Sequence, residues 1–179
     1  MSVEVRPVRP EELTEVGDLV VDAYVADGLP AEHEYAHVLR SAADRAERAL
    51  VLVAVEVDDA VSPAAGSDGQ GRVLGTVTLA LPPSPYAEIA RDGEAEVRML
   101  AVHPDARGRG IGEVLMRTAM DLARARGART LALTTIATLH RARRLYDRLG
   151  LVRAPERDWG DDPAYELLVY VGPLSAEVP

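Results

Sequence analysis

The chain has 179 residues, 47% of them apolar, and a formal net charge of −9. This length and apolar content predict a single domain over residues 1–174, followed by a short tail at 175–179. The absence of cysteine excludes a disulfide framework, a thiolate nucleophile and a cysteine-ligated metal site. The N-terminus does not read as a signal peptide and no apolar run is long enough to span a membrane, so we expect a cytoplasmic protein without a membrane partner.

The charge is divided unevenly along the chain. Between Arg98 and Arg157 there are thirteen arginines and five acids, whereas the remainder has seven arginines and twenty-four acids. The basic segment suits a ligand with several phosphate charges. The acidic remainder argues against nucleic acid as a partner and mildly favours a cationic acceptor, although acidic surfaces chiefly keep proteins soluble.

The first half of the chain predicts two strands around two helices. Val3 to Val8 alternates as a strand does, and a helix begins at Pro10 and runs to about Val25. A second helix is expected from Ala31 to about Arg48. The continuous β-branched stretch from Leu50 to Val57 predicts an inner strand.

A glycine-rich loop at 58–71 then connects to a strand from Arg72 to Leu81, which we expect to pair antiparallel with its predecessor. Glu96 to Val102 predicts a buried strand. It is followed by a turn and by a helix with apolar residues at helical spacing, from about Ile111 to the capping residue Gly127.

The last part of the chain predicts two further strand and helix signals and a closing pair of strands. Arg129 to Thr135 predicts a strand and Ala137 to Leu149 a helix. Leu151 to Ala154 and Tyr165 to Val171 are expected to close the sheet as an antiparallel pair.

The loop before the Ile111 helix has the properties of a phosphate site. Its glycines allow backbone N–H groups to point into one concavity, and the helix N-terminus adds partial positive charge. A Walker A loop is excluded because the chain contains no lysine. A dinucleotide fingerprint is excluded because Glu113 occupies the position of its third glycine.

Arg107 to Gly112 reads Arg-x-x-Gly-x-Gly after a strand ending Met-Leu-Ala-Val, and this resembles the acetyl-CoA loop of the GNAT family of N-acetyltransferases. The resemblance implies an α/β fold with a central mixed, mostly antiparallel sheet flanked by helices, and acetyl-CoA as co-substrate. It also implies two sets of cofactor-binding backbone groups. The diphosphate set is Arg107, Gly108, Arg109, Gly110, Ile111, Gly112 and Glu113; the set for the pantetheine and thioester carbonyl is Leu100, Ala101 and Val102.

A second segment, from Ala142 to Leu151, is similar to the A-x-x-L-Y-x-x-x-G-F motif of the same family. The resemblance implies that Tyr146 protonates the departing coenzyme A thiolate. A phenol with a pKa near ~10 stays protonated at neutral pH and can neutralise a thiolate whose conjugate acid has a pKa near ~8.5. The alternative is a tyrosine that packs on the apolar face of its helix.

Leu151 stands where the motif has Phe, and two further positions depart from the family pattern. Many relatives have a cofactor-contacting Asn where this chain has Leu139, and some N-terminal acetyltransferases place a glutamate base where it has Thr134. An acceptor ammonium must still lose a proton before it attacks the thioester. Glu96 is the candidate base, and the alternative is an ion pair with Arg98, two residues further along the strand.

Two other functions compete with direct acetyl transfer to a primary amine in a ternary complex. His33 to His37 reads His-Glu-x-x-His, the pattern of a zinc protease, but it lies at the start of a charged helix with no obvious third ligand, and we expect no metal. A domain that binds acyl-CoA without turning it over is the other alternative.

The acceptor is expected to be a small-molecule or peptide amine. The pocket walls that would select it are expected from Tyr24 to His37, Pro82 to Asp92 and Asp158 to Tyr165. The resemblance also makes a homodimer one possible assembly.

Overall fold

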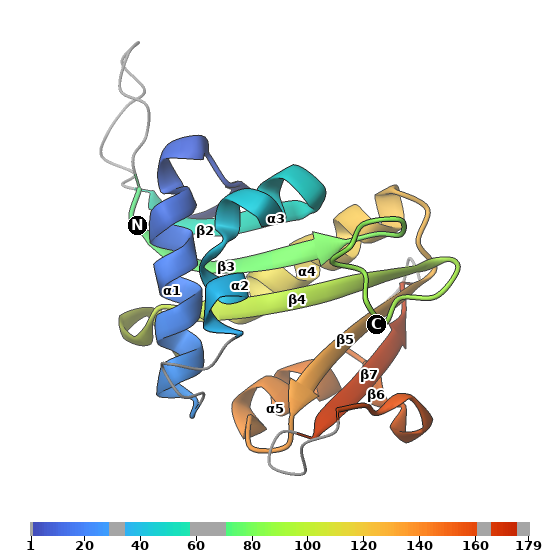
Figure 1. Ribbon diagram of the computed structural model, residues 1–179. Helices are drawn as coiled ribbons and strands as arrows, with labels where there is room; N and C mark the ends of the chain where they lie inside the picture. The colour runs from blue at the N-terminus through green and yellow to red at the C-terminus, as the bar shows by residue number, and fades with distance from the viewer. Residues whose placement is uncertain (1, 29–34, 58–70, 161–165, 175–179) are drawn as a thin grey trace.

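The computed structural model describes residues 2–28, 35–57, 71–160 and 166–174, which form a seven-stranded sheet with helices on both faces (Figure 1). The strand order is β1-β2-β3-β4-β5-β7-β6, and every neighbouring pair is antiparallel except β4 and β5. The mixed, mostly antiparallel sheet is therefore confirmed. The strands are β1 Ser2–Pro7, β2 Leu50–Val57, β3 Val73–Ala80, β4 Glu94–Val102, β5 Thr130–Ile136, β6 Val152–Arg153 and β7 Leu167–Pro173.

The α-helices lie in two layers. Helices α1, α2 and α3 cover one face of the sheet, and α4 runs behind it (Figure 1). The α-helices are α1 Leu13–Ala26, α2 Ala36–Arg40, α3 Ala42–Arg48, α4 Ile111–Ala125 and α5 His140–Arg148. None of the helices in the described part of the chain is long and apolar enough to cross a membrane.

The apolar side chains divide between these layers. One buried cluster joins α4 and α5 to the strands through residues such as Ile111, Leu115 and Leu145. The clusters on the opposite face join α1 and α2 to β4 and α1 and α3 to β2. This division follows the two-residue alternation of buried strands, which sends neighbouring side chains to opposite faces.

The expected single helix from Ala31 to Arg48 is wrong in its described part. The chain forms α2 and α3 instead, because Ser41 between them leaves the helical region at φ −77° and ψ 64°. The guanidinium of Arg45 fills the junction and donates to the carbonyl oxygens of Val38 and Leu39. Carbonyls at a helix end lack partners within the helix, so this side chain satisfies groups that the break exposes.

The other expected elements are present with shifted ends. The predicted strand at Glu96 begins two residues earlier, at Glu94, and the predicted helix at Ala137 begins at His140. Gly127 has φ +87°, as expected of a left-handed cap. The expected tail at 175–179 lies outside the described residues.

The parallel pair β4 and β5 separates partway along its length. Pairing runs from Glu94↔Thr130 to Val97↔Leu133 and stops there, although β4 continues to Val102. The two strands diverge visibly in Figure 1. Beyond Val97, no strand of the described part of the chain pairs with the β5-facing edge of β4.

A β-bulge lies within the separated part of β4. Between the pairs Thr78↔Arg98 and Thr76↔Ala101, β4 has two residues where β3 has one. Met99, one of these two, has φ +53°, which a non-glycine residue rarely adopts. Because the bulge reverses the alternation, Arg98 and Met99 both face the layer of α1 and α2.

Helices α1 and α2 touch through Gly17. A Cβ at Gly17 would overlap the carbonyl oxygen of Arg40, a backbone atom that cannot turn away. Gly17→Ala should therefore destabilise the fold by about 1–3 kcal/mol, the usual cost of overpacking, although Ala is the better helix former. Thermal unfolding measures this effect. Gly112→Ala is the matched control, because its Cβ would lie at an ordinary 3.5 Å from Leu145 Cδ2; a stabilised Gly17→Ala variant would contradict the close contact.

Candidate active site

The loop between β4 and α4 presents a set of unbonded backbone amides. Gly108 and Gly110 have φ +81° and +79°, which lets the chain turn into the helix without a strained side chain. A Cβ at either glycine would meet no atom within 4 Å. Among the described residues, no acceptor takes a hydrogen bond from the amides of residues 108–112. Together with the N-terminus of α4, they form an open anion site.

Two of the seven backbone amides expected to bind the diphosphate are already hydrogen-bonded within the chain. The amide of Arg107 donates to Pro104 O at 3.2 Å, and the amide of Glu113 donates to Gly110 O at 3.0 Å. These two nitrogens are therefore already used by the turn and by the first helical turn. The carboxylate of Glu113 bonds Arg117, and this bond holds its pKa below the usual value.

Tyr146 lies on α5 with its ring inside the core. Its side chain is 5% exposed, and its ring centroid is 5.7 Å from that of Tyr170. Among the described residues its hydroxyl makes no hydrogen bond. Burial, with a smaller contribution from Tyr170, raises the pKa of Tyr146, so the phenol keeps its proton across the physiological range. The packed position predicted for this residue and a donor role are thus compatible.

Glu96 lies on β4 and is 2% exposed. Its Oε2 accepts hydrogen bonds from the amides of Ile89 at 2.8 Å and Ala90 at 3.2 Å, both in the loop between β3 and β4. Burial raises the pKa of Glu96; the Ile89 amide and the charge of Arg98 oppose this effect without cancelling it. A carboxylate with a raised pKa is a better proton acceptor than an exposed one.

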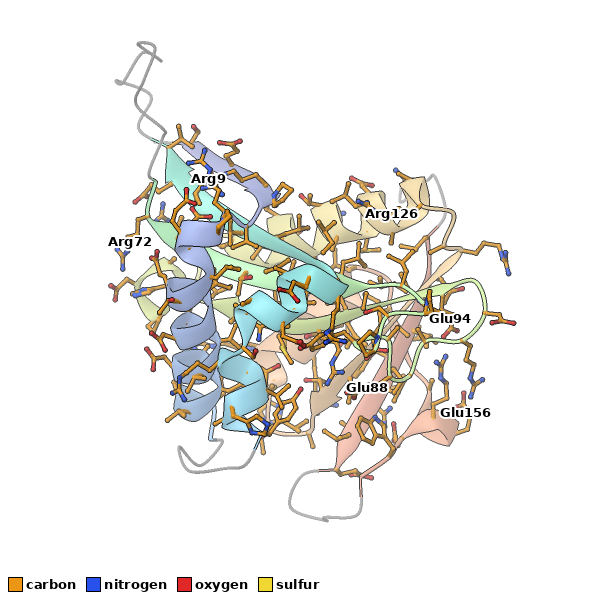
Figure 2. The ribbon with its side chains drawn as sticks, turned by 45° about the horizontal axis from the view of Figure 1, so that its top comes forward. Arg9, Arg72, Glu88, Glu94, Arg126 and Glu156 are labelled. Carbon is orange, nitrogen blue, oxygen red and sulfur yellow. The ribbon has the colours of Figure 1, made fainter. Side chains whose placement is uncertain are left out.

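The expected ion pair between Glu96 and Arg98 is long, at 3.9 Å between Oε1 and Nε. Arg98 instead pairs with Glu88, with 2.6 Å between Nη1 and Oε1, and donates to the hydroxyl of Tyr35 at 2.8 Å. Glu88 belongs to the loop between β3 and β4, whose side chains Figure 2 displays. Glu96 is therefore not neutralised by a close cation.

Tyrosines and arginines gather on the α1 and α2 side of β4. Tyr24 on α1 and Tyr35 before α2 pack against the buried cluster on this face, and Tyr35 accepts the hydrogen bond from Arg98. Burial raises the pKa of Tyr24, and the nearby Tyr35 and Tyr146 raise it further. Arg45 is fully buried, and its Nε and Nη2 have no hydrogen-bond partner among the described residues.

Arg157 connects β4 to the loop between β3 and β4 whose amides bond Glu96. Arg157, in the short helix Pro155–Arg157, donates to both carboxylate oxygens of Glu94, at 3.0 and 2.8 Å. Its Nη2 also donates to Ile89 O at 2.7 Å. Both partners of the pair are largely buried. The carbonyl and the amide of Ile89 thus connect Arg157 with Glu96.

The other residues that the sequence analysis singled out do not gather at one point. Leu100, Ala101 and Val102 lie on the part of β4 that has left β5. Leu139 directly precedes α5, and Thr134 accepts a 3.4 Å hydrogen bond from the indole of Trp159. His33 and Glu34 lie outside the described residues, as does most of the expected wall at Asp158–Tyr165.

The described part of the chain contains no cluster of three His, Asp or Glu side chains that could hold a metal ion. The sequence did not reveal that Tyr35 and Glu88 are the partners of Arg98, or that Arg45 reaches the carbonyls of α2. Only tertiary contacts bring these residues together, so no local pattern could have found them. The bulge at Met99 was missed for the same reason.

Comparison with known proteins identifies relatives of one kind. Residues 14–151 match the profile of the Acetyltransferase (GNAT) family. A mycothiol acetyltransferase from Beutenbergia cavernae is 35% identical over 83 residues, which are 46% of this chain and 25% of that protein. A putative ribosomal protein bS18-alanine N-acetyltransferase from Bacillus subtilis is 34% identical over 58 residues, 32% of this chain and 38% of that protein. The chain thus aligns with well under half the length of these curated relatives.

A solved structure shares the fold over nearly its full length. It is a putative acetyltransferase from Salmonella typhimurium with its cofactor acetyl-CoA. Its TM-score is 0.66 at 16% identity, and the match covers 100% of this chain and 98% of the other.

The pKa of Glu96 can be tested without any substrate. Carboxyl NMR should find it above the usual glutamate value because the side chain is buried. Arg98→Met should raise it further, since the Arg98 charge lowers it, whereas Arg72→Met should leave it unchanged. A Glu96 pKa at or below the usual value would contradict this electrostatic description.

Proposed function

Because the chain belongs to the GNAT family of acetyltransferases, we propose that it transfers the acetyl group of acetyl-CoA to a primary amine. The transfer is direct: the amine attacks the thioester in a ternary complex, and no enzyme nucleophile intervenes. The lack of cysteine agrees with this reaction.

One observation carries the proposal, namely the five amides of residues 108–112, which have no acceptor among the described residues and lie beside the point where β4 and β5 separate. They suit the diphosphate of coenzyme A, since amides at a helix N-terminus bind phosphate oxygens. The free edge of β4 from Leu100 to Val102 suits the amide groups of the pantetheine arm. It would bind that arm as a further strand binds a sheet edge.

Glu96 is the proposed base. An alkylammonium ion with a pKa near ~10 must lose a proton to become a nucleophile, and a buried carboxylate beside the acceptor can take it. The pKa of Glu96 is raised by burial, and its nearest cation, Arg98, is engaged by Glu88 and Tyr35. These contacts support the role of base over that of ion-pair partner.

Tyr146 is the proposed donor to the departing sulfur. Since burial raises its pKa above that of a free phenol, it serves first as a hydrogen-bond donor to the developing thiolate. Its hydroxyl has no partner among the described residues, so a ligand would not have to displace one.

The acceptor is a small-molecule or peptide amine. The names of the two relatives point to different acceptors, mycothiol chemistry in one and a ribosomal protein alanine in the other. The polar groups of Tyr35, Glu88 and Arg98 beside Glu96 support an amine site on the α1 and α2 side of β4.

Release of coenzyme A thiol with a panel of amines tests the activity. Tyr146→Phe should lower kcat roughly 10²-fold, the usual effect of removing one donor to a developing anion. Thr134→Val, which removes a half-buried hydroxyl that accepts a hydrogen bond from Trp159, is the control and should retain most activity. Binding of acetyl-CoA without thiol release would identify a non-catalytic acyl-CoA-binding module instead.

The pH dependence of kcat/KM tests the base. The rate should rise with pH through the pKa of Glu96, because only the carboxylate accepts a proton, and burial places this rise above the range of an exposed glutamate. Glu96→Gln should remove the rise and lower the rate roughly 10²-fold.

Glu88→Gln is the matched control for the pH profile. The charge of Glu88 contributes to the raised pKa of Glu96, so its removal should shift the acid limb to lower pH and keep it. An acid limb that survives unchanged in Glu96→Gln would remove Glu96 from the mechanism.

A further inference from the structure

A basic hollow lies between the phosphate loop and α5. It has a volume of about 470 Å³ and is lined by Arg107 and Gly108 of the loop and by Arg141, Arg144 and Arg148 of α5. We call these five residues the arginine hollow. Its three helical arginines are spaced three and four residues apart, which places them on one face of α5.

The arginines of the hollow are weakly neutralised. Arg148 approaches Glu113 only to 3.6 Å, and the same carboxylate is bonded more closely by Arg117, at 2.8 Å. Arg107 approaches Asp27 to 3.7 Å. The side chains of Arg141 and Arg144 form no ion pair with any described residue.

The positive charges of this cluster destabilise the helix unless an anion binds between them. Like charges three and four residues apart on a helix repel each other, and these three arginines make up a third of the nine residues of α5. The neighbouring Arg143 is used elsewhere, donating to Tyr170 OH at 3.2 Å and to Ala137 O at 3.1 Å. The exposed arginines that face the hollow are therefore available to a ligand.

The position of the hollow indicates which anion it would take. It shares Arg107 and Gly108 with the loop proposed to hold the diphosphate of coenzyme A. In coenzyme A the 3′-phosphate hangs from the same ribose as the diphosphate, so it must lie close to that loop. A phosphate monoester carries nearly two charges at neutral pH, and guanidinium groups bind it through paired hydrogen bonds.

We propose that Arg141, Arg144 and Arg148 bind the 3′-phosphate of coenzyme A, and that the chain discriminates acetyl-CoA from acetyl-dephospho-CoA. The inference rests on the proposed acetyltransferase function and adds a second phosphate site to it. The loop amides bind the diphosphate, which both donors have. The arginine hollow binds the 3′-phosphate, which only acetyl-CoA has.

Calorimetry with the two donors tests the proposal on the full chain. The wild-type protein should bind acetyl-CoA about 10- to 100-fold more tightly than acetyl-dephospho-CoA, as expected for charge-assisted hydrogen bonds to one phosphate. The double variant Arg141→Gln/Arg144→Gln should lose most of this preference. Its affinity for acetyl-dephospho-CoA should stay within about two-fold of the wild-type value, because the hydrogen bonds to the diphosphate remain.

Arg126→Gln is the control for the change in net charge. Arg126 follows the last residue of α4, on the order of 20 Å along the helix from the loop, and donates to Leu122 O (Figure 2). It should leave both affinities unchanged. Arg141 and Arg144 are exposed, so the double variant should keep the wild-type melting temperature.

The outcomes separate the two proposals. Equal wild-type affinities for the two donors would overturn the 3′-phosphate site and leave the acetyltransferase function standing. Equal weakening of both donors in the double variant would mean that the hollow holds the diphosphate, which also overturns the site. Failure of either donor to bind at millimolar concentration would overturn the proposed function itself.

Discussion

The separation of β4 from β5 is the constraint on which the other features of the site depend. Parallel pairing ends at Val97 and Leu133, so no strand of the described part of the chain pairs with that edge of β4 beyond this point. Backbone donors and acceptors need hydrogen-bond partners, which solvent or a ligand can supply. The open edge leads to the loop at 108–112, whose amides are also unbonded. This line of main-chain groups suits the elongated donor proposed for the chain.

The two faces of the sheet beside this open edge present different titratable groups. On the side of α1 and α2, Glu96 is buried beneath the amides of Ile89 and Ala90, and its pKa is raised. On the side of α4 and α5, Tyr146 is held against Tyr170 with its proton retained. The proposed proton acceptor and the proposed proton donor therefore lie on opposite faces of one sheet. The bulge adds Met99 to the residues of β4 that pack toward α1 and α2.

The sequence predicted the parts of the molecule that local patterns encode. The strands β1 to β5, the helices α1 and α4 and the phosphate loop followed from periodicity, from proline and glycine positions and from the motif at Arg107 to Gly112. The break between α2 and α3 could not be predicted, because it is stabilised by Arg45 reaching back to carbonyls in the preceding helix. The left-handed Met99 carries no local signal either, since its conformation is imposed by pairing with β3.

The candidate site was predicted to a similar extent. Glu96 and Tyr146 were identified by resemblance, and the structure adds the burial that shifts both pKa values in the useful direction. The long distance between Glu96 and Arg98 could not be foreseen, because Glu88 and Tyr35 engage the guanidinium from distant parts of the chain. The spacing of Arg141, Arg144 and Arg148 is visible in the sequence, but only the structure shows that these side chains line one hollow with Arg107 and Gly108 of the loop.

The contacts of Arg157 connect the segment that follows edge strand β6 to the central strand β4. Its guanidinium donates hydrogen bonds to the carboxylate of Glu94, where β4 and β5 are still paired, and to the carbonyl of Ile89. The peptide segment held in this way supplies the amide that bonds Glu96. A displacement of the short helix Pro155–Arg157 would therefore alter the contact with Glu94 and the position of the amide that bonds Glu96 together.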